Sequence, residues 1–119
     1  MLARNARGIP VWLPAPPKFF PVPSYASREF QGEVRKWFAA FAEEVRSRKY
    51  PEGPLIALQV DNEMQMFWRL AAFDGDYHPD ALSWWAEFDD RPAPTAYRSD
   101  DMDRQLAWLR FKEHYVARS

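Results

Sequence analysis

The sequence predicts an α/β protein, and three observations support that fold class. Residues 28–48 have apolar side chains at helical spacing, residues 55–60 form a short and almost continuous apolar run, and two further helical patterns follow. A helix followed after a few residues by a strand that is apolar on both faces is typical of parallel sheets built from βα units. The composition fits a folded domain, because 47% of the 119 residues are hydrophobic and 28% are charged.

The N-terminal part is expected to be an extended loop. Residues 8–23, GIPVWLPAPPKFFPVP, hold more than half of the 11 prolines in the chain. Proline fixes φ and has no amide donor, so this segment is predicted to be neither a helix nor a central strand.

The first helix is predicted over residues 28–48. Ser27 is a suitable N-cap, and Glu29 lies in the first turn, where the helix dipole favours an acid. Pro51 and the Gly53-Pro54 pair end the helix and begin a short connection. One face of the helix carries Phe30, Val34, Trp37, Phe38, Phe41 and Val45.

A buried strand is predicted over residues 55–60, LIALQV. Leu58 and Val60 are expected to face helices, whereas Gln59 faces the other side of the sheet, because side chains alternate along a strand. For the ten residues after Glu63, MQMFWRLAAF, periodicity does not separate a helical turn from an ordered loop.

Two more helices are predicted, over residues 79–89 and 101–117. Pro79 suits the first position of a helix, and His78 before it is interpreted as a helix-start residue rather than a catalytic base. The first of these helices is expected to bury Leu82, Trp85 and Phe88. The second carries Met102, Leu106, Leu109 and Val116 at helical spacing, with Trp108 and Phe111 nearby.

A single predicted strand has no partner in this chain. Its backbone N–H and C=O groups would be exposed at both edges. We therefore expect the chain to be part of a larger fold.

The predicted strand ends in three polar residues, Asp61, Asn62 and Glu63. Alternation places Gln59, Asp61 and Glu63 on one face. An unpaired, fully buried carboxylate is costly, so these acids should be paired or lie at a site open to water. Catalytic groups of α/β barrels lie at the C-terminal ends of strands, and this end of the run therefore predicts a site.

Three motifs resemble one enzyme family. Residues 8–13 read GIPVWL, residues 37–38 read WF, and residues 53–63 read GPLIALQVDNE. They resemble the retaining β-galactosidases of glycoside hydrolase family 35, with family 42 next closest. The resemblance covers roughly residues 5–63 and is weaker beyond them.

The resemblance implies a fragment of a (β/α)8 TIM barrel, about strands 3 and 4 with their helices. Since a whole barrel needs about 250 residues, residues 1–119 would be a partial glycoside hydrolase catalytic domain. Asp61 and Met64 stand where family 35 more often has glutamate and tyrosine, and Arg7 where it usually has glycine. These departures leave the sugar and the linkage open, so another retaining β-glycosidase of the same clan is an alternative.

The resemblance also assigns chemical roles. Glu63 would be the general acid/base of a retaining double displacement, and Asn62 would bind the 2-hydroxyl of the sugar. Asp61 either contacts the substrate or supports its neighbours. Trp12 either stacks on a sugar ring or anchors the loop. The nucleophile of this clan comes from strand 7, which this chain lacks, so the chain alone is expected to be inactive.

Composition limits the kinds of molecule that this chain is expected to bind. The net charge of -1 gives no electrostatic signature for nucleic acid or an anionic membrane. There is no cysteine, and the two histidines, His78 and His114, lie far apart, which disfavours a zinc site. No cofactor and no metal are expected, and the expected partner is a carbohydrate, a terminal β-galactoside or a related β-glycoside.

No apolar run reaches the roughly 20 residues of a membrane helix, and the N-terminus lacks the apolar core of a signal peptide. A cytoplasmic location is therefore favoured over a membrane or secreted one.

Two further expectations depend on local geometry. We expect regular strand structure to stop by Asp61, with Asn62 and Glu63 both facing the site, as β-bulges beside active sites permit. Asp76 and Tyr77 are placed by sequence position alone where they could line a pocket. The alternative from another class is a small helical, non-enzymatic binding module, which would fold alone and tolerate Glu63→Gln.

Overall fold

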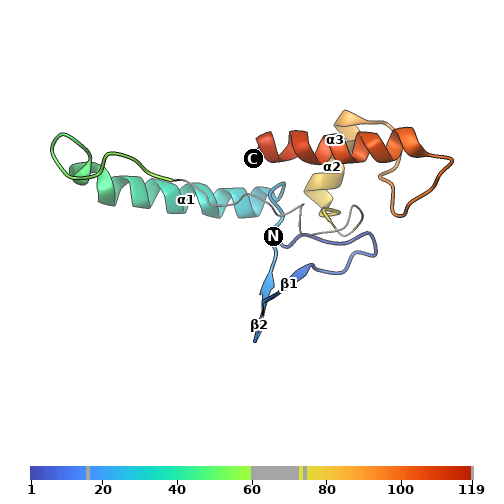
Figure 1. Cartoon of the computed structure of the whole chain (residues 1–119), viewed down its shortest axis with the longest axis horizontal. Helices are drawn as coiled ribbons and strands as arrows, with labels where there is room; N and C mark the ends of the chain where they lie inside the picture. The colour runs from blue at the N-terminus through green and yellow to red at the C-terminus, as the bar shows by residue number, and fades with distance from the viewer. Residues whose placement is uncertain (16, 60–72, 74, 119) are drawn as a thin grey trace.

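The structure, a computed structural model, describes residues 1–15, 17–59, 73 and 75–118. Figure 1 shows the arrangement: α1 extends to one side of the N-terminal segment, and α2 and α3 lie together on the other side. The elements are β1 (Trp12–Ala15), β2 (Lys18–Pro21), α1 (Arg28–Val45), the short 3-10 helix η1 (Arg46–Arg48), α2 (Pro79–Phe88) and α3 (Met102–Arg118). This is too little sheet to display a β/α barrel, which stays a prediction.

The proline-rich N-terminal part forms a β-hairpin, so the predicted extended loop is wrong, but its described residues hold neither a helix nor a central strand, as predicted. β1 and β2 pair antiparallel, with Trp12 opposite Pro21 and Leu13 opposite Phe20. Proline is compatible with this arrangement because both strands of a two-stranded sheet are edge strands, where a missing donor need not break a ladder.

Behind the hairpin, three chain segments meet at Ala3, Val11 and Val22. The amide of Ala3 donates to the carbonyl of Val22, that of Val22 donates to Val11, and that of Val11 donates to Ala3, at 2.9, 3.0 and 2.9 Å. All three side chains are buried, with Leu13 and Tyr25 packed against them. This closed set of hydrogen bonds fixes the N-terminal segment against the base of the hairpin.

The helix predicted over residues 28–48 is confirmed as α1 followed by η1. Ser27 is its N-cap, and the Ser27 hydroxyl accepts a hydrogen bond from the amide of Phe30 at 3.3 Å. No residue of α1 is buried, however. Trp37 is 59% exposed, and its ring stacks on the ring of Phe41 with centroids 5.3 Å apart. The apolar face that the sequence predicts is present, and Phe30 at its beginning stacks on Tyr25, but Trp37 further along the helix is largely exposed.

The main core lies between α2, α3 and the segment before α1. Ala26, Tyr77, Ala81, Trp85, Trp108 and Phe111 form this buried cluster. Trp85 meets Trp108 edge-on, with ring centroids 5.2 Å apart, and Phe111 in the same way at 5.4 Å. Such aromatic pairs contribute about 0.5–1.5 kcal/mol beyond the burial of their surface.

The helices predicted at 79–89 and 101–117 are confirmed as α2 and α3, but their buried faces differ from the prediction. Trp85 is buried as expected, whereas Leu82 is 36% exposed and Phe88 is 45% exposed. On α3 the buried aromatic residues are Trp108 and Phe111. The predicted stripe is largely exposed, with Met102 at 41%, Leu106 at 45% and Leu109 at 43%.

The connection after η1 is a tight turn. The amide of Leu55 donates to the carbonyl of Arg48 at 2.8 Å, and the amide of Gly53 donates to the carbonyl of Lys49 at 2.9 Å. A Cβ on Gly53 would overlap the backbone of Arg48, so the turn requires glycine there.

The strand predicted over 55–60 is not formed in its described residues, 55–59. Leu55 makes an isolated parallel bridge with Lys49, and residues 56–59 have no regular secondary structure. A parallel strand needs neighbouring strands for its amides and carbonyls. Leu58, expected to face helices, is 49% exposed. Val60 lies outside the described residues.

Among the described residues, no helix combines the length and the apolar character needed to cross a membrane.

Candidate functional site

The residues predicted to carry the chemistry, Asp61, Asn62 and Glu63, lie outside the described residues. The expected end of the strand at Asp61 and the orientation of Asn62 and Glu63 therefore remain predictions. Immediately before them, Ile56 is 84% exposed and Leu58 is 49% exposed. An uncovered apolar segment thus precedes the predicted catalytic residues.

Trp12, the fourth predicted site residue, lies at the start of β1 and is 51% exposed. Since Trp12 is opposite Pro21 and Pro14 is opposite Phe19, these four side chains share one face of the hairpin. Phe19 is 70% exposed. This face of the hairpin therefore presents two aromatic rings to solvent, a surface able to stack on the apolar face of a flat ligand.

Sequence reasoning missed Phe19 because the hairpin itself was not predicted. No alternating pattern marks the two strands, WLPA and KFFP, because each contains a proline. Because about half of the surface of Trp12 is open, its two alternatives, stacking on a sugar ring and anchoring the loop, both stay predictions.

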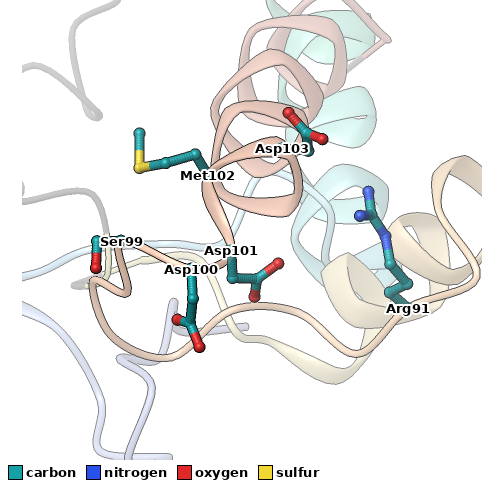
Figure 2. A pocket seen from close by; sticks show the side chains of 6 residues that line it. All are labelled: Arg91, Ser99, Asp100, Asp101, Met102 and Asp103. Atoms are coloured by element: carbon teal, nitrogen blue, oxygen red, sulfur yellow. The ribbon is translucent and has the colours of Figure 1, made fainter.

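A hollow of about 420 Å³ lies at the beginning of α3. Figure 2 shows that most of its lining comes from the loop before α3 and from the first turn of that helix, with Arg91 contributed from the segment after α2. Trp12, the predicted site residue that the structure describes, does not line it. The lining residues are Arg91, Ser99, Asp100, Asp101, Met102 and Asp103.

Two of the acids that line this hollow, Asp100 and Asp101, are held in ion pairs. Asp100 accepts two hydrogen bonds from the guanidinium of Arg98, at 3.1 and 2.9 Å, and these bonds together with its positive charge lower the pKa of Asp100. Asp101 forms an ion pair with Arg104. A general acid needs a raised pKa near the working pH, so Asp100 does not suit that role. Within the described residues, no three carboxylate or imidazole side chains are grouped so that they could hold a metal ion.

Another ion pair lies at the end of α2. The guanidinium of Arg91 donates to both carboxylate oxygens of Asp89, at 2.9 and 2.6 Å. These hydrogen bonds lower the pKa of Asp89 to about 2. The carbonyl of Arg91 accepts a hydrogen bond from the indole of Trp85 at 2.7 Å, which ties the ion pair to the core.

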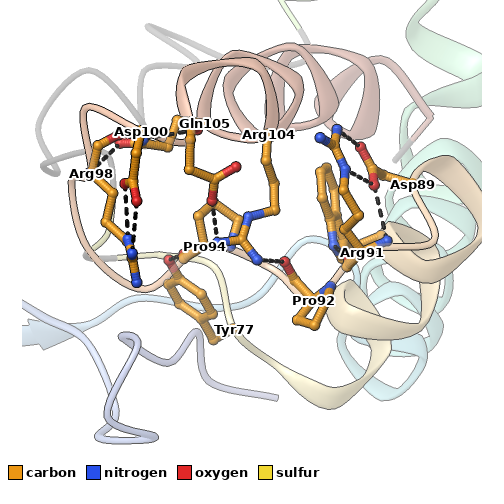
Figure 3. Close-up of polar contacts among 11 residues, drawn as sticks. Tyr77, Asp89, Arg91, Pro92, Pro94, Arg98, Asp100, Arg104 and Gln105 are labelled. Atoms are coloured by element: carbon orange, nitrogen blue, oxygen red, sulfur yellow. Dashed lines mark hydrogen bonds and ion pairs between the residues drawn. The ribbon is translucent and has the colours of Figure 1, made fainter.

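Figure 3 shows how polar contacts fix the loop between α2 and α3. The amide group of Gln105 donates to the carbonyl of Arg98 and, at 2.9 Å, to that of Asp101. The guanidinium of Arg104 donates to the carbonyl of Pro92 at 3.2 Å. The hydroxyl of Tyr77 donates to the carbonyl of Pro94 at 2.5 Å. The network bonds to backbone carbonyls along the loop, so we assign it a structural role.

Asp76 and Tyr77 are not among the residues that line the hollow at the beginning of α3, and both are buried. Asp76 is 2% exposed, and its Oδ1 accepts hydrogen bonds from the amides of Arg4 and His78 at 3.3 and 2.9 Å. Tyr77 is 7% exposed and packs on Trp108 with ring centroids 5.0 Å apart. Both residues join the N-terminal segment to the aromatic core.

Comparison with known proteins gives no relative: no family model, no curated protein and no solved structure matches this chain.

Proposed function

We propose that this chain is the part of a retaining, β-galactosidase-like glycoside hydrolase that carries the acid/base residue Glu63. The observation that carries the proposal is the sequence PLIALQVDNE at residues 54–63, an apolar run that ends in Asp-Asn-Glu after an amphipathic helix. In a (β/α)8 barrel, a strand of this kind delivers its terminal residues to the active site.

Two features of the described residues support the proposal. Ile56 and Leu58, which lie on the face of the predicted strand that barrel helices would cover, are exposed, and so is Trp37 on the apolar face of α1. A soluble monomer seldom exposes large apolar surfaces without a partner for them. The remaining strands and helices of a barrel would cover both. An independent binding module is less favoured, because it would bury the apolar face of its own longest helix.

In the proposed mechanism, Glu63 first protonates the leaving glycosidic oxygen and later removes a proton from the attacking water. This needs a carboxyl group with a raised pKa. Asn62 donates to the 2-hydroxyl, a contact that strengthens in the transition state. The nucleophile, a second carboxylate about 5–5.5 Å from the first, comes from outside this chain. The reaction requires no cofactor.

The first test uses the 119-residue chain alone, with phenyl and 2,4-dinitrophenyl β-galactosides as substrates. We expect no turnover, because loss of one member of a catalytic pair removes most of the rate. Robust turnover by the chain that Glu63→Gln abolishes would show that the chain holds its own nucleophile, contrary to the proposal.

The second test uses the chain joined to the coding sequence that flanks it. We expect this protein to cleave both substrates. Glu63→Gln should reduce kcat/KM about 100-fold or more for the phenyl galactoside and far less for the dinitrophenyl galactoside, whose leaving group needs no proton. Azide should restore turnover of the dinitrophenyl substrate by Glu63→Ala and yield the β-galactosyl azide.

The matched control is Glu87→Gln, which changes an exposed acid of α2. It should leave the rates for the phenyl and the dinitrophenyl galactoside unchanged.

Three results would count against the proposal. Equal losses for the two leaving groups would remove the acid/base role from Glu63. Cleavage of aryl β-glucosides or β-mannosides in place of galactosides would support the alternative, another enzyme of the same clan. Failure to cleave any aryl β-glycoside would exclude the enzyme.

A further inference from the structure

His78 is the N-cap of α2, and its side chain is 13% exposed. Its ring Nδ1 accepts a hydrogen bond from the amide of Asp80 at 3.2 Å. An accepting Nδ1 carries no proton, so the ring is neutral in this arrangement, with its proton on Nε2. The capping bond satisfies one of the amides that the first turn of a helix leaves without a partner.

Asp80 connects this cap to α1. Its Oδ2 accepts a hydrogen bond at 2.9 Å from the amide of Arg28, the first residue of α1 and 52 positions away in sequence. The same Oδ2 lies 3.7 Å from Nδ1 of His78. One carboxylate oxygen therefore lies between the beginning of α1 and the imidazole ring that caps α2.

Other charged groups adjoin this arrangement. Beneath it, Asp76 accepts hydrogen bonds from the amides of Arg4 and His78. On α1, Glu29 pairs with the N-terminal ammonium group at 3.4 Å. Both are acids that hold positions near the helix starts, and neither occupies the position of the capping nitrogen.

We propose that His78 is a proton-sensitive joint between α1 and α2. When Nδ1 takes up a proton, it becomes a donor and can no longer accept from the amide of Asp80. The imidazolium is then drawn to the Asp80 carboxylate, where it competes with the amide of Arg28 for Oδ2. The cap is present while Nδ1 accepts from the amide of Asp80, and protonation of Nδ1 removes it.

The joint acts on the position of α1, which is attached through its first turn. There the side-chain amide of Gln31 donates to the carbonyl of Tyr25 at 2.8 Å, and Phe30 stacks on Tyr25 with centroids 6.1 Å apart. Weakening the Asp80 contact loosens this attachment and with it the far end of α1, from which residues 55–59 extend. The inference does not depend on the proposed function.

Amide hydrogen exchange of the full chain at pH 7.5 and 5.5 tests the joint. After correction for the intrinsic pH dependence of exchange, protection at the amides of Arg28 and Asp80 should fall roughly fivefold at pH 5.5, the effect of losing one N-cap. Protection at Phe111, within the core of α3, should not change. Equal protection of Arg28 and Asp80 at the two pH values would overturn the proposal.

His78→Asn supplies a short capping acceptor that does not take up a proton in this range, and it should abolish the pH effect at both amides. The matched control is His114→Asn, which replaces the exposed histidine of α3 and should keep the effect. A pH effect that survives His78→Asn would assign it to another group and overturn the proposal. If His78→Asn does not fold by circular dichroism, His78→Ser provides a second capping residue for the same comparison.

Asp80→Asn separates the two parts of the joint. Asparagine can still accept from the amide of Arg28, but it offers no charge to an imidazolium. The pH effect should persist at position 80 and disappear at Arg28. Loss of protection at both amides in this variant would indicate general fraying of the two helices and would contradict the coupling.

Discussion

Two regions of this molecule carry large aromatic side chains and treat them in opposite ways. Between α2 and α3, Trp85 and Trp108 are 2% and 0% exposed and contact each other edge-on. On α1, Trp37 is 59% exposed, although it stacks on Phe41 of its own helix. Figure 1 shows the reason: α2 and α3 lie against each other, whereas α1 extends away from both.

The comparison teaches that helical spacing of apolar residues creates a face but does not bury it. Burial requires a second element, which α2 and α3 provide for each other. Trp37 on α1 and Ile56 and Leu58 after it are exposed instead. We therefore expect the aromatic core to contribute most of the free energy of folding. The exposed apolar faces are where we expect further protein to bind.

The sharpest way to break this comparison is a pair of tryptophan substitutions. Trp108→Ala removes a fully buried ring that contacts Tyr77, Trp85 and Phe111. We expect it to lower the free energy of unfolding by about 3–5 kcal/mol, measured by urea denaturation followed by circular dichroism.

Trp37→Ala is the matched control on α1. It should change the free energy of unfolding by about 0.5 kcal/mol or less, because Trp37 is largely exposed and alanine favours the helix. A cost for Trp37→Ala similar to that for Trp108→Ala would show that the α1 face is buried in the isolated chain, and the contrast between the regions would be lost.

The helices of this fold could be predicted from the sequence because their signals are local. Ser27 and the periodic apolar residues after it define α1, and the His78-Pro79 pair defines the start of α2. The hairpin could not be predicted in the same way. Its strands depend on the pairing of residues 12–15 with residues 18–21, and prolines mask their alternation.

The buried face of α3 could not be predicted from hydrophobicity alone. It includes Gln105 and Lys112, which are 5% and 6% exposed. Gln105 is buried because it bonds to loop carbonyls, and the ammonium of Lys112 lies 5.4 Å from the ring centre of Trp108. These partners come from tertiary structure. Hydrophobicity alone therefore does not predict that Gln105 and Lys112 are buried.

The candidate site depends on contacts of the same long-range kind. The predicted chemical roles of Asp61, Asn62 and Glu63 depend on residue type and on their position after an apolar run. The described residues do not include them. Only Trp12 can be placed, and the face it shares with Phe19 follows from strand register. No local pattern specifies register across a proline-containing connection.

A pair of glycine substitutions tests whether a change in the backbone near α1 leaves the aromatic core unaffected. Gly53→Ala places a Cβ against the backbone of Arg48 in the turn after η1. We expect a local cost of about 1–3 kcal/mol, seen as faster exchange of the Leu55 amide, which donates to Arg48. The aromatic core should keep its unfolding midpoint, because the turn does not contact it.

Gly32→Ala is the matched control within α1. A Cβ there meets no atom within 4 Å, so alanine should stabilise the helix by about 0.5–1 kcal/mol. A lower unfolding midpoint of the core for Gly53→Ala would contradict the separation of the two regions, as would destabilisation by Gly32→Ala.

The smallest expected effect concerns the ion pair between Asp89 and Arg91, at the end of α2 beside the aromatic core. The hydrogen bonds from Arg91 lower the pKa of Asp89 from its ordinary value of 3.8 to about 2. A carboxylate with a lowered folded-state pKa stabilises the fold fully above about pH 4, and this contribution disappears as the pH falls through about 2. Because Arg91 is 45% exposed, we expect the ion pair to contribute less than about 1 kcal/mol to the free energy of unfolding.

Between pH 5 and pH 2, Asp89→Asn should therefore lose less stability than the natural chain in urea denaturation. The control Asp90→Asn, at the adjacent acid, should lose as much as the natural chain. Identical losses for Asp89→Asn and the natural chain would show that this ion pair does not contribute to the stability of the core.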